Sequence, residues 1–527
     1  MGFGVLRHEA WRVLLKDSNR HDIARGREHK LAMSSQPVVS SLTPWSLLLP
    51  PVGVTAFLWV TRVSEVTPEA VLYAFFLLLI PWCSFLIWRQ RRRRGIPVFA
   101  LVALAYWWFF AIGLFWLDRE LRLGRGVVAV EEVTGAVWLA LVGVVCIGAG
   151  MKVHIPQLTP ERQLELDDHP TSWIYVRWIL VLGTLGSLIP GFYNLLGADG
   201  RHIMQILIST VPTVALMLLL RRCLEEKESR LDRALLWGYF PVRIVIGLAS
   251  GWLGSAVSLG LVCGAMYLFV RRKVPWTLIA ISVITVLFLE VGKNDFRAQY
   301  WNGEANGGLA EKATSWVNGS ASKWSDALQE GGGNSSRDLS NESLERTSLL
   351  PQVAHVLELT PSQVPFQMGQ TYSYLAITLI PRFMWPDKPS VNDANHYYQV
   401  AFGLTGERDL NNVNIGIGCL TEAYINFGWP GVAGIMLAIG VLLSIYERTF
   451  VSSTSSKLFF AIGLALLPGV LGIESQMSAY LGGVIQHIAL TIIVFLPVVR
   501  RGAHGVRAGQ SRPGPAPVTG QLRVRPS

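Results

Sequence analysis

Arg382, Trp385 and Lys388 lie in one short stretch, LIPRFMWPDKP (379–389), which also contains three prolines. Proline lacks an amide donor and biases the preceding residue towards extended geometry, so a helix does not run through this stretch. The guanidinium of arginine is a planar fork that suits phosphate oxygens, whereas lysine offers a mobile point charge. We interpret the stretch as a rigid turn that holds two cations beside an aromatic ring for an anionic ligand. A solvated turn is the alternative.

Glu422 and His396 are the candidate proton acceptors. Glu422 is the single charged residue in CLTEAYINFGW (419–429), which leads into an apolar segment. A carboxylate next to hydrocarbon is unfavourable unless it is paired, so such a residue is a candidate for function. His396 follows the proline-rich stretch and could take a proton from a substrate hydroxyl. The alternatives are a structural salt bridge for Glu422 and an ordinary polar surface position for His396.

Four further cations, Arg243, Lys293, Arg297 and Arg346, are candidates for binding an anion. Arg243 lies within an apolar segment and needs an anionic partner, either Glu422 or a ligand. Lys293 and Arg297 lie one helical turn apart beyond another apolar segment, where they could equally anchor a membrane boundary. Arg346 lies at the start of an amphipathic segment that is predicted to be helical. The N-terminus of a helix is an unfavourable place for a cation unless an anion is nearby. Metal-binding patterns such as HExxH are absent, so the sequence predicts neither a metal site nor a cofactor.

The elements that must position these residues are membrane helices. The chain has 527 residues, of which 51% are hydrophobic and 16% are charged, whereas soluble domains carry roughly 25% charged residues. About 20 consecutive apolar residues span the hydrocarbon core of a bilayer. The apolar segments predict an all-α polytopic protein with twelve spans: 45–63, 68–88, 96–117, 133–150, 173–195, 203–220, 235–250, 251–270, 274–291, 428–446, 457–473 and 480–499.

Lysine and arginine collect at one side of this arrangement. Basic clusters follow the second, sixth, eighth and last spans, at 89–94, 221–222, 271–273 and 500–501. All four face the cytoplasm if the chain crosses twelve times with both termini inside. The net charge of +10 therefore reflects topology, and we expect no nucleic-acid partner.

One long loop, 292–427, leaves the membrane on the outer face. Its first part, 302–345, is rich in Gly, Ser and Asn and is predicted to be flexible. The second part, 346–427, is predicted to be a folded lobe because long loops with apolar content are usually ordered and functional. The complete predicted organisation is a cytoplasmic extension (1–44), nine spans (45–291), the loop (292–427), three spans (428–499) and a disordered cytoplasmic tail (500–527).

Four motifs in the second half of the chain resemble those of oligosaccharide repeat-unit polymerases of the O-antigen polymerase (Wzy) type. They are RTSLL (346–350), VPFQMGQTYSYL (364–375), LIPRFMWPDKP (379–389) and LTEAYINFGWPGV (420–432). The resemblance covers mainly residues 290–446. It implies a glycosyltransferase of the bacterial cytoplasmic (inner) membrane with a GT-C-like helical architecture. Such enzymes join undecaprenyl-diphosphate-linked oligosaccharide units on the periplasmic face without a metal ion.

The resemblance also implies that loop arginines and neighbouring polar groups bind the lipid-linked substrate. Arg346 and Arg382 would hold the diphosphate and stabilise the charge that develops as its bond to the sugar breaks. Glu422 or His396 would accept the proton of the attacking hydroxyl. The complete set of predicted substrate-binding residues is Arg243, Lys293, Arg297, Arg346, Gln370, Tyr372, Arg382, Trp385 and Lys388.

Two other functions fit the same features. An O-antigen ligase transfers finished polymer and also carries a large outer loop with arginine and histidine. A transporter or flippase of lipid-linked glycans would also bind an anionic lipid, but transporters usually contain internal repeats, which this sequence lacks. Besides the substrate and membrane lipid, the resemblance suggests chain-length regulator and flippase proteins as partners.

Overall fold

The computed structural model is predominantly helical in the part of the chain that it describes. That part comprises residues 44–62, 66–90, 95–115, 122–123, 126–127, 130–153, 164–189, 191–195, 197–301, 307–329, 348–378, 380, 384–385, 387–390, 392–410 and 415–501. The chain divides into two compact units, Met1–Leu49 and Pro50–Ser527. Of the first unit, the structure describes residues 44–49 at the start of one helix.

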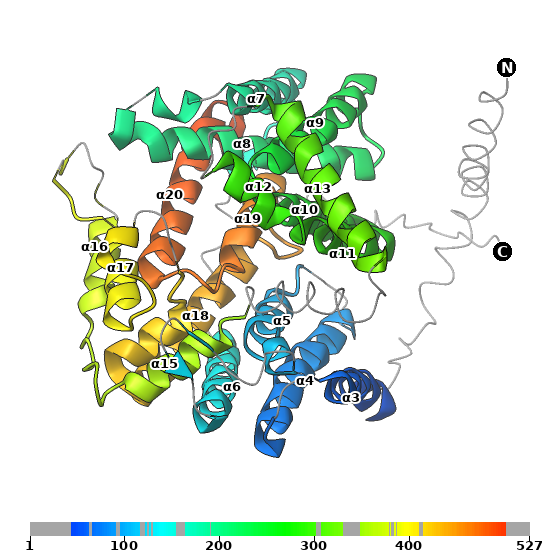
Figure 1. Ribbon diagram of the computed structural model, residues 1–527. Coiled ribbons are helices and arrows are strands. Elements are labelled where there is room, and N and C mark those ends of the chain that lie inside the picture. Colours follow the sequence, from blue (N-terminus) through cyan, green and yellow to red (C-terminus); the bar gives the residue numbers. More distant parts are fainter. Residues whose placement is uncertain are drawn as a thin grey trace, which may run out of the picture. The chain divides into compact units, whose positions relative to one another are not determined.

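Seventeen α-helices are described along the chain (Figure 1). They are α3 (Pro44–Thr61), α4 (Pro68–Gln90), α5 (Val98–Phe110), α6 (Val130–Lys152), α7 (Pro170–Leu188), α8 (Gly197–Leu224), α9 (Arg230–Ala249), α10 (Leu253–Arg271), α11 (Trp276–Glu290), α12 (Lys293–Tyr300), α13 (Leu309–Gln329), α15 (Leu350–Leu359), α16 (Ser373–Thr378), α17 (Asp393–Ala401), α18 (Cys419–Thr449), α19 (Lys457–Val470) and α20 (Met477–Phe495).

Shorter elements complete the described fold. The 3₁₀ turns are η2 (Ile112–Phe115), η4 (Phe192–Asn194), η5 (Gln370–Tyr372), η6 (Glu407–Asp409) and η7 (Leu496–Val498). Four short strands form two antiparallel pairs, β1 (Arg122–Leu123) with β2 (Gly126–Val127) and β3 (Leu164–Leu166) with β4 (Val499–Arg501). In the second pair, Leu164 is opposite Arg501, so the segment before α7 is paired with the segment after α20.

A helix lies at each of the twelve predicted spans, but the predicted number of spans is too high. In the described residues, seven helices are long and apolar enough to cross a membrane: α4, α5 with η2, α6, α8, α10, α18 and α20. The count is eight if α11 and α12, bent by 55°, form one broken span. Helices α3 and α19 are apolar but short, and α9 carries Arg230, Asp232, Arg233 and Arg243. The protein is thus a polytopic helical membrane protein.

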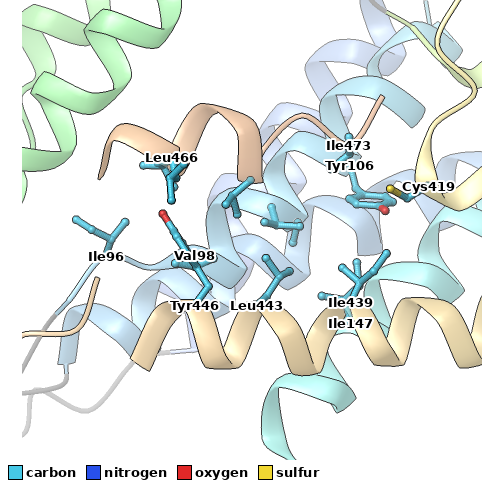
Figure 2. Packing of buried hydrophobic residues seen from close by; sticks show 14 of the residues in the cluster. Ile96, Val98, Tyr106, Ile147, Cys419, Ile439, Leu443, Tyr446, Leu466 and Ile473 are labelled. Carbon is cyan, nitrogen blue, oxygen red and sulfur yellow. The ribbon is translucent and has the colours of Figure 1, made fainter. Parts of the chain in front are cut away.

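The hydrophobic core lies where α18 crosses α6, with α5 and α19 against the same region. Tyr106 of α5, Ile147 of α6 and Ile439 of α18 are buried together there (Figure 2). Close backbone approach fixes the crossing, because a Cβ on Gly150 or Gly440 would lie 2.1 Å from a carbonyl oxygen of the other helix. Small residues at such crossings allow membrane helices to pack tightly.

Connections between helices gather at two ends of this bundle. At one end, the segment before α7 pairs with the segment after α20, and Lys457, the first residue of α19, forms a salt bridge with Asp168. Arg271, the last residue of α10, likewise contacts Glu226 between α8 and α9. We call this the basic end. At the opposite end, the amide of Leu349 donates to the carbonyl of Phe109 at the end of α5. We call that the lobe end, and the described residues between 348 and 418 the lobe.

The stretch 302–345, predicted to be flexible, contains α13. Trp316 on this helix is buried, and its indole Nε1 donates to the carbonyl of Leu289 at 2.9 Å. Phe296 stacks on Trp316, so α11, α12 and α13 form a small second core. The prediction of flexibility relied on the Gly, Ser and Asn content, whereas the structure places a helix with one apolar face at 309–329.

Helix α18 begins nine residues before the predicted span at 428, and it is interrupted there. Gly428 has φ 61° and ψ −149°, which separates a short N-terminal segment from the long one. A positive φ is readily adopted by glycine, and a Cβ at this position would lie 3.1 Å from the ring of Phe366. The N-terminal segment carries Glu422, which therefore lies in a helix rather than in the loop.

Candidate functional site

Glu422 is the centre of a buried hydrogen-bond network at the lobe end. Its side chain is fully buried, at 0% exposure. Thr371 Oγ1 donates to Oε1 at 2.8 Å, and the amide of Met477 donates to Oε2 at 2.6 Å. A buried carboxylate needs such donors because desolvation otherwise penalises it strongly. Glu422 thus connects the lobe, α18 and the first residue of α20 through neutral partners.

Asn426, one helical turn after Glu422, extends this network to the lobe. Its Nδ2 donates to Thr371 Oγ1 at 2.7 Å, and its Oδ1 accepts from the amide of Gly369 at 2.9 Å. The amides of Gln367 and Met368 donate to the carbonyls of the N-terminal segment of α18. The segment before η5 is therefore attached to α18 by backbone and side-chain bonds together.

Tyr372 and its neighbours form the apolar side of this region. The ring of Tyr372 stacks on Phe427 at 6.2 Å and 13°. Burial raises the pKa of Tyr372, and its hydroxyl has no hydrogen-bond partner among the described residues. Several large apolar side chains of the lobe and of the adjoining part of α18 are solvent-exposed: Met368, Ile380, Met384, Trp385, Tyr397, Phe427 and Trp429. Exposed apolar groups on this scale indicate contact with lipid or a ligand.

Lys388 of the proline-rich stretch is buried, at 9% exposure. Its Nζ donates to the carbonyl of Ile380 at 2.7 Å and lies 3.5 Å from that of Thr378. These carbonyls lie at and just after the C-terminus of α16, where a cation interacts favourably with the helix dipole. Lys388 thus closes the turn, while Trp385 is partly exposed. This contact contributes to the fold whether or not the ammonium also meets a ligand.

A polar cluster that sequence reasoning missed lies beside this turn. Gln486 of α20 donates to the carbonyl of Thr378 at 2.9 Å. Next to it, His487 Nδ1 lies 2.7 Å from Thr210 Oγ1, and its ring is 5.8 Å from that of His202. Histidines within apolar helices are a detectable signal, but only the fold places α8, α20 and the lobe together.

His396 lies on α17 and is partly exposed, at 31% of its side chain. Its Nδ1 is 3.8 Å from Asp393 Oδ1 one turn earlier, which is longer than a hydrogen bond. Gln370 in η5 is exposed. His396 lies on α17 and Glu422 on α18, and no hydrogen bond or salt bridge joins them in the described residues.

Lys293 and Arg297 have structural partners. Lys293 forms a salt bridge with Glu290. The guanidinium of Arg297 donates to the carbonyl of Gly251 through Nε and Nη2, at 3.2 and 3.1 Å. It also lies 4.3 Å from the ring centroid of Trp301. Arg297 thus holds the α9–α10 turn against α12, a contact across 46 residues that hydropathy does not reveal.

Arg243 is not paired with Glu422, which was one of its two predicted partners. Both oxygens of Glu422 accept from other groups. Within the described residues, Arg243 is half-buried on α9 and has no salt bridge, and its guanidinium acts electrostatically on Tyr239. Arg346 and Arg382 lie outside the described residues, so their predicted convergence stays a prediction.

Comparison with known proteins gives one family. The family model described as "Domain of unknown function (DUF8712)" matches residues 174–467, more than half of the chain. The match includes the lobe, the proline-rich stretch and Glu422. Searches of curated proteins and of solved structures found no significant match. In the described residues, no group of three or more His, Cys, Asp or Glu side chains is placed to hold a metal ion.

Proposed function

The chain belongs to the DUF8712 family, and we propose that it polymerises undecaprenyl-diphosphate-linked oligosaccharide units on the outer face of the bacterial cytoplasmic membrane. The proposal rests first on the resemblance of the four motifs to O-antigen polymerases. All four motifs lie within the family match, between residues 346 and 432. The alternative with the same chemistry is a ligase that transfers finished polymer.

The observation that carries the proposal is the attachment of the lobe to the helix ends. The Glu422 network fixes the segment before η5, and Lys388 closes the turn after α16. Between these two points, the lobe exposes Met384 and Trp385. An amphiphilic donor needs an apolar surface for its lipid and sugar faces next to cations for its diphosphate. The proline-rich stretch supplies Trp385 and, in its sequence, Arg382.

The reaction needs an acceptor hydroxyl to lose its proton while the sugar–phosphate bond breaks. Arg346 and Arg382 stabilise the departing diphosphate, which needs no general acid because it is a good leaving group. His396 is the better placed of the two proton acceptors because it is accessible and stands beside Asp393. Glu422 is assigned a positioning role, since both of its oxygens are occupied and its side chain is buried.

The test of phosphate binding is the length of polymer made in cells by single variants. Arg382→Ala and Arg346→Ala should each abolish long polymer, with the protein still present in the membrane. Arg382→Lys retains the charge but loses the planar fork, so it should give shortened or sparse polymer if two hydrogen bonds are needed. Long polymer from both alanine variants would exclude this function for the two arginines.

The test of the proton acceptor uses two histidines of the lobe. His396→Gln should lower the rate of polymerisation by about 10²-fold or more. The matched control is His355→Gln. Both ring nitrogens of His355 already have protein partners, since Nε2 contacts the carbonyl of Phe402 and Nδ1 lies near Glu358, so this histidine is not expected to take a proton from a substrate. Equal rates for the two variants would remove His396 from the mechanism. A purified reaction with a single lipid-linked unit distinguishes polymerase from ligase, because only a polymerase yields a ladder of products.

A further inference from the structure

A cavity of about 510 Å³ opens at the basic end, away from the lobe. It lies between the start of α7, the end of α8 and the start of α19. Its charged lining residues are Asp168, Arg177, Arg221, Arg222, Glu225, Lys227 and Lys457, and its apolar ones are Pro170, Trp173, Ile174 and Leu218. The proposed polymerase reaction uses none of these residues, so the cavity requires a separate explanation.

Positive charge exceeds negative charge in this cavity. Five cations line it, with the carboxylates of Asp168 and Glu225. One more carboxylate, that of the fully buried Asp232, accepts from Arg177 at 2.7 Å and lies 3.7 Å from Arg222. Five cations therefore meet three carboxylates among the described residues, an excess of two positive charges. Clustered cations in a concave, partly apolar wall attract an anion strongly.

Two arginines of the cavity retain unused donors. Arg221 is bonded through Nε to Glu225 at 2.8 Å, and Arg222 donates through Nη2 to the carbonyl of Lys227 at 3.0 Å. In each of them Nη1 is buried and has no hydrogen-bond partner among the described residues. Each of these two guanidinium groups therefore keeps one donor that no described protein group engages. The ring of Trp173 lies 4.0 Å from the guanidinium of Arg222 and keeps it in place.

The apolar wall of the cavity continues along α7 towards the lobe end. Ile174 lines the cavity and is followed at helical spacing by Trp178, Leu182 and Leu185. All four side chains are about half exposed or more. An exposed apolar stripe of this kind suits contact with an acyl chain. A ligand with an anionic head and an apolar tail fits both parts, with its head among the arginines and its tail along α7.

We propose that this cavity binds the phosphate head group of an anionic membrane phospholipid in the leaflet at the basic end, with one acyl chain along α7. The planar forks of Arg221 and Arg222 donate to phosphate oxygens, and Lys457 adds charge at the rim. Basic pockets between helix ends are known to suit lipid phosphates. The site is separate from the lobe, so its loss and the loss of polymerisation are distinguishable.

The experiment is native mass spectrometry of the full chain in detergent, titrated with phosphatidylglycerol. One phosphatidylglycerol molecule should bind more tightly than any further copies. Arg221→Gln should weaken the binding of this first molecule by about tenfold, as expected for the loss of one charge-assisted interaction. Arg271→Gln is the matched control, because Arg271 also ends a helix at the basic end and pairs with Glu226, yet it does not line the cavity. Lys457→Gln is a second, more exposed variant in case Arg221→Gln does not fold.

Three outcomes would overturn the proposal. Phosphatidylcholine should bind more weakly because its head group is neutral overall, so equal binding of the two lipids would exclude recognition of charge. Glycerol 3-phosphate carries the phosphate without acyl chains, and equal binding of it would show that a soluble anion is the ligand. Equal weakening by Arg221→Gln and Arg271→Gln would show that lipid binds to the basic end at large rather than in the cavity.

Discussion

Asp232 at the basic end and Glu422 at the lobe end are both completely buried, yet they are stabilised in different ways. Asp232 accepts from Arg177 and from the amide of Ser229, and Arg222 lies 3.7 Å away. Glu422 accepts from a hydroxyl and an amide, those of Thr371 and Met477. One carboxylate is held by cations and the other by neutral donors.

The difference shows what each end of the bundle is built to do. At the basic end, Asp232 already engages two arginines, and the surplus of cations is directed to the cavity. At the lobe end, Glu422 is satisfied by the neutral donors of Thr371 and Met477. A buried charge without a counter-charge is tolerated only when several donors point at it. Substitutions of the two carboxylates and of their partners test this contrast.

The largest effect is expected from Asp232→Ala. It leaves the guanidinium groups of Arg177 and Arg222 without their carboxylate, and breaking a buried ion pair destabilises by about 3 kcal/mol or more. Asp232→Asn should be nearly as damaging, because the amide restores no charge. The measurement is the apparent melting temperature and the yield of monodisperse protein in detergent. A mild effect of the asparagine variant would mean that charge is not what Asp232 contributes.

At Glu422, the alanine and amide substitutions should differ in their effect on stability, whereas at Asp232 they should be nearly equal. Glu422→Ala leaves the Thr371 hydroxyl and the Met477 amide unsatisfied, which should lower the free energy of unfolding by about 2–3 kcal/mol. In Glu422→Gln, the new amide can accept from Met477 and donate to Thr371 Oγ1. The free energy of unfolding should therefore fall by about 1 kcal/mol or less. The ratio of the amide effect to the alanine effect should therefore be small here and near one at Asp232. If Glu422→Gln melts as early as Glu422→Ala, the carboxylate has a charged partner.

Thr371→Val should have a smaller effect, about 1–2 kcal/mol, because it removes the hydroxyl that joins Glu422 to Asn426. Thr360→Val is the control. Thr360 is also a buried threonine of the lobe, but its hydroxyl has no partner among the described residues. Limited proteolysis of the lobe should be faster for the first variant and unchanged for the second. Similar cleavage of both would mean that the network does not hold the lobe.

The sequence predicted the helices and singled out Glu422, but it did not reveal the partners of this carboxylate. Long apolar segments in the sequence indicate helices in contact with hydrocarbon, and a helix lies at each predicted position. Thr371 and Met477 are neutral and lie 51 and 55 residues from Glu422, so no local pattern connects them with it. A salt bridge was the alternative considered for Glu422, and the structure has ion pairs at Asp232 instead. There the sequence shows only a Ser229 capping box at the start of α9.

The position of a cation in the sequence does not reveal which groups already engage it. Arg297 was predicted to bind substrate, yet its guanidinium donates to Gly251 and lies over Trp301. Lys388 was expected to project from the proline-rich stretch, and its ammonium meets backbone carbonyls of that turn. In the described part of this stretch, the amide of Lys388 donates to the carbonyl of Trp385. The direction of a side chain depends on tertiary contacts such as that of Gln486 with Thr378.

The smallest effect is the dependence of stability on acid at the basic end. Burial opposes the charge of Asp232, but hydrogen bonds from Arg177 and Ser229 outweigh it and hold its pKa below the usual value. The hydrogen bond from Lys457 likewise lowers the pKa of Asp168. A lowered pKa stabilises the fold above the unfolded value of about 3.9, and this contribution is lost as the pH falls through the folded value.

Wild type and Asp232→Asn should therefore differ in apparent melting temperature by a constant amount between about pH 7 and pH 5, where an unfolded aspartate of pKa about 3.9 is ionised. Below about pH 4 the difference should shrink, because protonation removes the charge of the wild-type carboxylate, a charge that the amide of the asparagine variant lacks at every pH. Asp168 remains in both proteins and serves as the internal reference for acid sensitivity. A difference that stays constant down to about pH 3 would mean that the arginines at Asp232 do not stabilise its ionised form, and the contrast with Glu422 would then disappear.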